Sequence, residues 1–446
     1  MKKRTVILGG GESGTGAALL AQRLGMDVFL SDKNELKEKY RRELTERNIA
    51  FEEGGHTVSK IETADLIIKS PGIPSRLPLL QNARKGTEII DEIEFAFRSL
   101  KGKIIGVTGT NGKTTTALLT YHLLKTAGKN VVLAGNVGES LARKITAEKY
   151  DWHVVELSSF QLDNCYSFRP DIGILLNITP DHLDRYEYKM ENYIDSKRRL
   201  IQSMKADDIF IGWHDNELTG SLMDKGLTPT TLAVSLKNKT AAIHGEEENM
   251  IFNLEEKFSI PQSETALKGT HNRINMMCSA AAAFKAGCSA DDIRKGLKTF
   301  VNAPHRLENV GAVNGMSFVN DSKATNVEAA IYALGSFQAP LVWVAGGIDK
   351  GNDYSLMTEE VKKKVRVLIC LGADNSALLS AFGKVVPVVE EARSAAAAVE
   401  AAIKYGQKGD VVLLSPACAS FDLFQNYEDR GTQFREAVKE AMKTTA

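Results

Sequence analysis

The chain has 446 residues, of which 56 are lysine or arginine and 56 are aspartate or glutamate, so its formal net charge is zero. This balance excludes a generic binder of nucleic acids or membrane surfaces, because such proteins usually carry a basic excess. Apolar residues make up 43% and charged residues 25%, which is typical of a globular protein and excludes disorder as the main state. At roughly 100–200 residues per domain, the length predicts about two to four domains.

The five cysteines are scattered and form no CxxC pair, which indicates reduced thiols rather than a disulfide framework. The basic start of the chain is followed by only a short apolar run and then glycines, which favours a strand over a secretory signal. No run approaches the ~18–20 apolar residues that a membrane helix needs. We therefore predict a cytoplasmic protein with neither nucleic acid nor membrane as a partner.

Short β-branched runs alternate with helical stretches along the whole chain, and this pattern predicts parallel α/β sheets. In chain order the predicted strands are 6–8, 28–30, 66–68, 104–107, 131–133, 154–157, 172–178, 316–319, 341–344, 367–371 and 411–414. Helices give way to new segments near 95–103 and near 300–305. These seams predict three α/β domains at 1–95, 96–302 and 303–446.

A glycine-rich loop, 9–16, follows the first predicted strand directly, and Asp32 follows the end of the next one. It fits G-x-G-x-x-G, in which glycines let the backbone approach a diphosphate at a helix N-terminus. Two interpretations stay open on this motif alone. One is NAD or FAD binding, and the other is a Rossmann-like turn that serves another nucleotide or none.

A second loop, Thr108-Gly-Thr-Asn-Gly-Lys-Thr-Thr115, lies between the strand at 104–107 and a helical stretch. It resembles a phosphate-binding P-loop, whose backbone N–H groups hold phosphates, with Lys113 at the β/γ oxygens and Thr114 at Mg²⁺. The strict pattern requires glycine at 107, where this chain has valine. Strand, loop, Gly-Lys-Thr and helix nevertheless occur in the required order.

Acidic and histidine residues follow the next strands, with Glu156 at the end of one and His182 after another. Because the carboxyl ends of parallel strands meet at one edge of a sheet, both are expected beside the phosphate loop. Taken singly, Glu156 also fits a helix cap or an ion pair, and His182 fits an ordinary polar residue. Periodicity alone makes the segment 197–199 a solvated helix face.

Polar, small and cationic residues again follow predicted strands in the last third of the chain. They form the stretches 304–308, 320–326, 346–351 and 415–422. Any one of them fits turn chemistry, but several at successive strand ends favour a single ligand site.

With these motifs assembled, the chain resembles the Mur ligase family, which adds amino acids to the peptide stem of peptidoglycan precursors. The matching stretches are 108–114, Asn136, 154–162, 177–186, Lys197, 269–275, 304–308, 320–326 and 414–422. The resemblance implies a UDP-binding Rossmann-like domain, a central P-loop ATPase domain and a Rossmann-like C-terminal domain. Within the family, the motifs 320–326, 414–422 and 425–431 resemble the ADP-forming member that joins D-glutamate to UDP-N-acetylmuramoyl-L-alanine. It works through an acyl phosphate, in the cytoplasmic synthesis that supports the cell wall, cell shape and cell division.

The resemblance also implies roles for individual residues. The catalytic set is Lys113, Glu156, His182, Lys197 and Arg306. The ATP-binding set is Gly109, Thr110, Asn111, Gly112, Lys113, Thr114, Thr115, Asn272, Arg306 and Asp321. Two Mg²⁺ ions are implied at Thr114, Glu156, His182 and Lys197, the last as a carbamate formed with CO2. The set for the UDP substrate is Ser13, Gly14, Asp32, Lys33, Ser70, Pro71, Gly72, Asn136 and His182. The D-glutamate set is Lys323, Thr325, Lys350, Ser420, Phe421 and Tyr427, where Tyr427 replaces the family's usual phenylalanine. We expect a monomer.

Three other functions stay open from the residues. A related ligase with another acceptor, such as a folylpolyglutamate synthase, would share the P-loop but has no need of a separate UDP-binding domain. An NAD-linked oxidoreductase would explain the glycine loop with Asp32. A non-catalytic nucleotide-binding regulator would show no sustained turnover.

Overall fold

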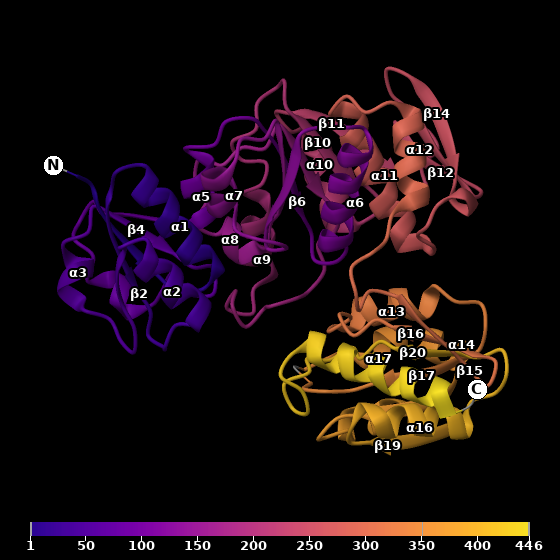
Figure 1. The fold of residues 1–446 in the computed structure, drawn as a ribbon. Coiled ribbons are helices and arrows are strands. Elements are labelled where there is room, and N and C mark those ends of the chain that lie inside the picture. The colour runs from indigo at the N-terminus through magenta and orange to yellow at the C-terminus, as the bar shows by residue number, and fades with distance from the viewer. Residues whose placement is uncertain (1, 350, 445–446) are drawn as a thin grey trace. The chain divides into compact units, whose positions relative to one another are not determined.

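The computed structural model describes residues 2–349 and 351–444. The chain folds into two compact units, Met1–Ala266 with Ile274–Phe300, and Leu267–Arg273 with Val301–Ala446. Together they contain three sheets flanked by helices, which confirms the predicted α/β class (Figure 1). Two of these sheets lie in the first unit.

The first sheet is entirely parallel and has the strand order β3-β2-β1-β4-β5. Its strands are β1 (Arg4–Leu8), β2 (Asp27–Ser31), β3 (Ala50–Glu52), β4 (Leu66–Lys69) and β5 (Glu88–Asp91), and its helices are α1 (Glu12–Arg23), α2 (Glu38–Glu46), α3 (Val58–Glu62), α4 (Pro78–Gln81) and α5 (Glu92–Phe97). The direction in which strands are added reverses between β1 and β4. In doubly wound sheets ligands bind at such a reversal, at the carboxyl ends of the strands.

The second sheet has the order β14-β13-β12-β11-β10-β9-β6-β8-β7 and is parallel except for β13, which runs antiparallel to both of its neighbours. Its strands are β6 (Lys103–Thr108), β7 (Val131–Gly135), β8 (Trp152–Glu156), β9 (Ile172–Leu175), β10 (Ile209–Trp213), β11 (Thr230–Ser235), β12 (Ile243–Glu246), β13 (Asn249–Asn253) and β14 (Lys257–Pro261). Its helices are α6 (Lys113–Thr126), α7 (Leu141–Ala147), α8 (Ser159–Leu162), α9 (Met190–Arg198), α10 (Glu217–Asp224), α11 (Thr270–Lys285) and α12 (Ala290–Thr299). The phosphate loop follows β6, in the middle of this sheet.

Helices join the first two sheets into one unit, since α1 and α5 both pack against α7. Apolar residues from both sides of this packing, such as Leu20 and Leu141, belong to a single buried cluster. Arg143 on α7 adds ion pairs to Glu12 at 2.7 Å and to Glu43 at 2.5 Å. Its side chain is only 16% exposed, so these pairs are screened less than ordinary surface pairs.

The third sheet belongs to the second unit and has the order β15-β16-β20-β17-β18-β19. Only its edge strand β15 runs antiparallel to its neighbour. Its strands are β15 (Glu308–Val313), β16 (Met316–Asn320), β17 (Leu341–Ala345), β18 (Val365–Leu371), β19 (Val388–Ala392) and β20 (Val411–Leu414), and its helices are α13 (Val327–Gly335), α14 (Thr358–Lys364), α15 (Ser376–Phe382), α16 (Ala395–Tyr405) and α17 (Tyr427–Thr444). Separate apolar clusters form its core, one around Trp343 and the other around Phe434.

The cysteines Cys165, Cys278, Cys288, Cys370 and Cys418 are all free and buried. Burial raises the pKa of each of these thiols, for example to about 12 for Cys278. Within the described part of the chain, no helix is both long and apolar enough to cross a membrane.

Candidate functional site

The glycine loop lies after β1, at the strand reversal of the first sheet. The Asp32 carboxylate accepts hydrogen bonds from the backbone N–H of Gly10 at 2.6 Å and of Asn34 at 2.8 Å. A Cβ atom on Gly14 would stand 1.7 Å from the carbonyl oxygen of Gly9, so helix α1 can approach the loop only with glycine there. Asp32, which follows β2, therefore fixes the backbone of the glycine loop through its hydrogen bond to Gly10.

The other residues expected at the UDP substrate lie around this loop. Ser70 follows β4, and its hydroxyl donates to the Gly9 carbonyl at 3.4 Å. Arg185 donates from its guanidinium to the carbonyl oxygens of Pro71 at 2.9 Å and of Gly72 at 3.2 Å. Lys33 is exposed on the loop after β2, whereas Ser13 and Gly14 lie in the first turn of α1. The predicted residues of the first sheet thus lie at its carboxyl edge, with Arg185 as an unexpected contact, whereas Asn136 and His182 of the same set follow β7 and β9 of the second sheet.

The phosphate loop joins β6 to α6 and is held by the segment after β9. The Thr110 N–H donates to the Asn177 carbonyl, and the Asn111 N–H donates to the Asn177 side-chain oxygen, both at 2.8 Å. Gly112 caps α6 with φ of +85°, a left-handed conformation that favours glycine. The Lys113 ammonium donates to the carbonyls of Gly109 at 2.9 Å and Thr110 at 2.7 Å, so it lies over the loop. Thr114 and Thr115 occupy the first turn of the helix.

Glu156 lies at the end of β8, which pairs with β6 and β7. Only 1% of the residue is exposed, and its Oε1 accepts a 2.7 Å hydrogen bond from the Asn136 amide. Its Oε2 is buried and has no hydrogen-bond partner among the residues that the structure describes. A buried carboxylate oxygen of this kind is costly unless something compensates it. A hard cation such as Mg²⁺ therefore fits this position.

His182 lies on the loop after β9 with φ of +52°, and its side chain is 48% exposed. Its ring lies 5.1 Å from that of Phe160, centroid to centroid, and its Nε2 is 3.6 Å from the Asp181 carboxylate. Among residues 2–349 and 351–444, no three His, Cys, Asp or Glu side chains are grouped to hold a metal ion. Magnesium bound near Glu156 would therefore take water and phosphate oxygens as ligands in addition to protein side chains, as Mg²⁺ usually does.

Lys197 on α9 is buried, in contrast to the solvated helix face that periodicity suggested. The residue is 1% exposed, its ammonium donates to the Gly109 carbonyl at 2.8 Å, and it lies 4.7 Å from the centre of the Tyr193 ring. Burial, followed by repulsion from Lys113, holds the pKa of Lys197 well below its usual range. A lysine in such a place is held beside the phosphate loop with a weakened preference for its charged form.

Three residues of the expected ATP set lie in the second unit. Asp321, after β16, accepts hydrogen bonds from the Leu307 N–H at 3.1 Å and the Ser415 hydroxyl at 3.2 Å. Burial raises the pKa of Asp321 to about 7, although the charge of Arg306 opposes the rise. The Asn272 amide donates to the Lys268 carbonyl at 2.9 Å. The positive charge of Arg306 therefore acts on the Asp321 carboxyl group.

The residues expected at D-glutamate follow β16 and β20, at one end of the third sheet. The Lys323 ammonium lies 3.6 Å from the centre of the Tyr427 ring, and the Tyr427 carbonyl accepts from the Ser322 hydroxyl at 2.8 Å. Thr325 and Phe421 are exposed, whereas Ser420 is buried. Lys350 lies outside the described residues.

Arg430 on α17 is a buried cation that the sequence reasoning did not single out. It donates to the carbonyl oxygens of Ser322 at 2.9 Å, of Gly346 at 3.2 Å and of Cys418 at 3.2 Å. These acceptors follow β16, β17 and β20, so one side chain ties three strand ends together. Arg430 lies within the 425–431 motif, and this position is the sequence feature that could have identified it as a functional residue. Burial lowers the pKa of Arg430 to about 10, so the guanidinium stays charged at neutral pH.

Family models match most of the chain in three consecutive segments. The model described as MurD N-terminal domain matches residues 4–76, the Mur ligase middle domain matches 107–283, and the Mur ligase, glutamate ligase domain matches 305–418.

Two similar proteins are named UDP-N-acetylmuramoylalanine--D-glutamate ligase. The one from Cytophaga hutchinsonii is 48% identical over 99% of this chain and 99% of its own length. The one from Bacteroides fragilis is 48% identical over 98% of this chain and 100% of its own length.

Solved structures share the fold at low sequence identity. A pseudomurein peptide ligase type C from Methanothermus fervidus has a TM-score of 0.63 at 19% identity, covering 98% of this chain and 100% of its own. The UDP-N-acetylmuramate-alanine ligase MurC from Thermotoga maritima has a TM-score of 0.62 at 17% identity, covering 98% and 99%.

Proposed function

The chain belongs to the Mur ligase family, and from this premise we propose that it joins D-glutamate to UDP-N-acetylmuramoyl-L-alanine at the expense of ATP. The observation that carries the proposal is the 48% identity to relatives of that name over nearly the full chain. The match of residues 4–76 to the MurD N-terminal domain speaks against a folate acceptor and against an NAD-linked oxidoreductase. The glycine loop, Asp32 and Ser70–Gly72 then hold the UDP end of the acceptor, with Asn136 and His182 nearer the reacting carboxylate.

The reaction begins by activating a carboxylate, which is a poor electrophile. The acceptor's carboxylate attacks the γ-phosphorus of ATP. The bond from this phosphorus to the β,γ-bridging oxygen breaks, so ADP leaves and an acyl phosphate forms. The amine of D-glutamate then attacks the acyl carbon, and inorganic phosphate leaves from the tetrahedral intermediate. Several anions meet in this sequence, so the cations Lys113 and Arg306 stabilise the charge that develops on the transferred phosphoryl group. Residues 109–115 hold the ATP phosphates, and Asn272, Arg306 and Asp321 contribute the remaining nucleotide contacts.

Magnesium fits the residues around the phosphate loop. Thr114 and Glu156 would hold one Mg²⁺, and Glu156, His182 and a carbamylated Lys197 would hold a second. The Glu156 Oε2, which has no hydrogen-bond partner among the described residues, supports this assignment. When bound, Mg²⁺ neutralises phosphate charge. Lys197 suits carbamate formation, because only a neutral amine attacks CO2 and burial lowers its pKa. The carbamate would convert a cationic side chain into an anionic one beside the Gly109 carbonyl.

The amino-acid substrate is assigned to the second unit. Lys323, Thr325, Lys350, Ser420, Phe421 and Tyr427 form the proposed D-glutamate pocket. Arg430 supports it by fixing the strand ends that follow β16, β17 and β20. We assign the three tasks to domains 1–95, 96–302 and 303–446, in a monomer that acts in the cytoplasm.

The decisive assay measures ADP release with UDP-N-acetylmuramoyl-L-alanine and each candidate amino acid in turn. We expect release to require both the acceptor and D-glutamate, and the Lys113→Ala variant to lose at least about 100-fold in kcat. Lys125→Ala is the matched control, because Lys125 is an exposed lysine on the same helix. ADP release that ignores D-glutamate would contradict the proposal, as would a fully active Lys113→Ala variant.

A further inference from the structure

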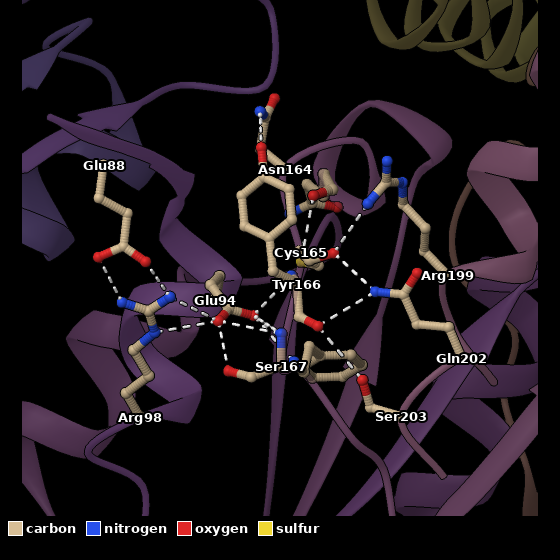
Figure 2. A network of polar contacts seen from close by, with 12 residues as sticks. Glu88, Glu94, Arg98, Asn164, Cys165, Tyr166, Ser167, Arg199, Gln202 and Ser203 are labelled. Atoms are coloured by element: carbon tan, nitrogen blue, oxygen red, sulfur yellow. Dashed lines mark hydrogen bonds and ion pairs between the residues drawn. The ribbon is translucent and has the colours of Figure 1, made fainter. Parts of the chain in front are cut away.

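Glu94 on α5 is a fully buried carboxylate that binds a loop of the second sheet rather than its own. It accepts hydrogen bonds from three successive backbone N–H groups, those of Tyr166 at 3.1 Å, Ser167 at 3.1 Å and Phe168 at 2.8 Å (Figure 2). Arg98 balances its charge through a 3.0 Å hydrogen bond. A carboxylate that accepts several backbone N–H groups fixes their positions firmly, because each bond is charge-assisted.

The same peptide groups are bound on their opposite side. The Cys165 carbonyl accepts from Arg199 at 3.2 Å and from Gln202 at 3.1 Å, and the Tyr166 carbonyl accepts from Gln202 at 3.2 Å and from Ser203 at 3.3 Å (Figure 2). Two consecutive peptide groups are therefore held between a carboxylate and the donors that follow α9. Hydrogen bonds in such a chain polarise one another, which strengthens each bond by about 10–30%.

These donors belong to the turn that directly follows α9, the helix that carries Lys197. The Leu200 N–H donates to the Lys197 carbonyl at 3.1 Å, and buried Leu200 packs so closely on β6 that a Cβ on Gly106 would lie 3.0 Å from it. Lys197 itself reaches the Gly109 carbonyl of the phosphate loop at 2.8 Å. The end of α9 thus links the loop held by Glu94 to the phosphate-binding backbone.

We infer that Glu94 is a positioning residue of the ligase reaction, which acts by fixing the loop at 165–168 and, through it, the end of α9 and Lys197. This inference rests on the proposed function for its effect on turnover. Glu94 touches none of the groups expected to react, so it acts only through the loop. The three backbone N–H groups all bond to Oε2, so a glutamine would keep them on its amide oxygen, but as neutral and therefore weaker hydrogen bonds. Its NH2 group would replace Oε1, which accepts from Arg98 at 3.0 Å and from the Ser167 hydroxyl, and would face the Arg98 donor without an acceptor between them.

The test compares Glu94→Gln with Glu88→Gln. Glu88 also binds Arg98, at 2.6 Å, but it is partly exposed and makes no hydrogen bond to the loop within the described chain. For Glu94→Gln we expect kcat to fall about 10–100-fold, as displacement of positioned groups by about 1 Å does. The KM for D-glutamate should stay within about twofold, because the proposed pocket lies in the other unit. Equal kcat values for the two variants would overturn the inference.

A second measurement does not depend on turnover. Lys197 is buried, so a small amine-reactive reagent should label it slowly in the wild-type protein, relative to exposed Lys189. In Glu94→Gln we expect labelling of Lys197 to rise at least about tenfold, while Lys285, whose side chain is 14% exposed, keeps its wild-type rate. Unchanged Lys197 labelling, or a parallel rise at Lys285 that reports general loosening, would overturn the inference.

The two measurements separate the inference from the function on which it rests. If the wild-type protein shows no D-glutamate-dependent ADP release, the proposed function fails while the labelling still decides the positioning. If Glu94→Gln does not fold, the double variant Gln202→Ala/Ser203→Ala removes donors from the other side of the same loop. This double variant should also raise the labelling of Lys197. If its Lys197 labelling and its kcat both equal those of the wild type, the inference is overturned.

Discussion

Replacing Glu92 by glutamine should make the protein more resistant to alkaline pH. Glu92 is 1% exposed and links α5 to α7 through a 2.5 Å hydrogen bond that its Oε1 accepts from the Ala142 N–H. Its Oε2 has no hydrogen-bond partner in the described structure. Burial, followed by repulsion from Asp91, raises the pKa of Glu92 from 4.5 to about 8. The folded protein therefore holds a proton at neutral pH that the unfolded chain has released.

The size and sign of the effect follow from that shift. Since the pKa is higher in the folded state, the stabilisation from this proton is complete below pH 4.5 and is lost as the pH rises toward 8. At 1.36 kcal/mol per pH unit, the loss amounts to about 5 kcal/mol. Glutamine cannot ionise, and like the protonated acid it keeps an acceptor for Ala142. The stability of the Glu92→Gln variant should therefore not show the decrease with rising pH that ionisation of Glu92 causes in the wild type.

The measurement is urea unfolding of the wild type and of Glu92→Gln at pH 6, 7.5 and 9. Unfolding is monitored by hydrogen exchange of peptides from α5 and α7, so that the measured stability is that of the first unit. Part of the loss of stability in the wild type has already occurred at pH 6, so between pH 6 and pH 9 we expect the variant to gain about 2.7 kcal/mol of stability relative to the wild type. Glu35→Gln is the control, since Glu35 is exposed. The reasoning is refuted if the difference between the variant and the wild type is the same at pH 6 and pH 9.

Three further predictions concern the proposed reaction. Glu156→Gln should lower kcat by about 100-fold and raise the Mg²⁺ concentration for half-maximal rate, and an unchanged Mg²⁺ titration would count against the metal assignment. Arg430→Met should lower the unfolding free energy of the second unit by about 3–5 kcal/mol, because it leaves buried carbonyl groups without donors. It should also raise the KM for D-glutamate, and a urea midpoint and KM equal to those of the wild type would refute this role. Gly14→Ala should weaken UDP binding in calorimetry, since its Cβ would collide with the Gly9 carbonyl, whereas Gly55→Ala, which has open space around it and lies outside the proposed UDP set, should bind normally. Equal affinities would show that the collision is relieved elsewhere.

The sequence predicts the sheets well where the signal is local. Buried β-branched runs mark the strands, and the order of strand, Gly-Lys-Thr and helix marks the phosphate loop. One predicted strand, 172–178, is too long, because β9 ends at Leu175. The residues after it leave the sheet to bind the phosphate loop, as Asn177 does with Asn111, and an apolar run does not reveal this departure.

Long-range packing decided what the sequence could not predict. Lys197 stands in a run of three cations, yet it is buried while Arg198 is exposed, because the neighbouring β6 and the phosphate loop cover one face of α9. Glu94 and Arg430 resemble ordinary charged helix residues. Glu94, however, binds Tyr166, which is 72 residues away, and Arg430 binds Gly346, which is 84 residues away. The packing of α1 and α5 on α7, which joins two sheets into one unit, has no local signature either.

The burial of every cysteine makes the native chain a ready background for site-directed spectroscopy. All five thiols are free, inside the protein, and shifted by burial toward the unreactive protonated form. A cysteine introduced at exposed Lys37 in the first unit and another at exposed Lys408 in the second should therefore take up maleimide dyes without removal of the native residues. Energy transfer between those dyes would then follow the distance between the two units as each substrate is added.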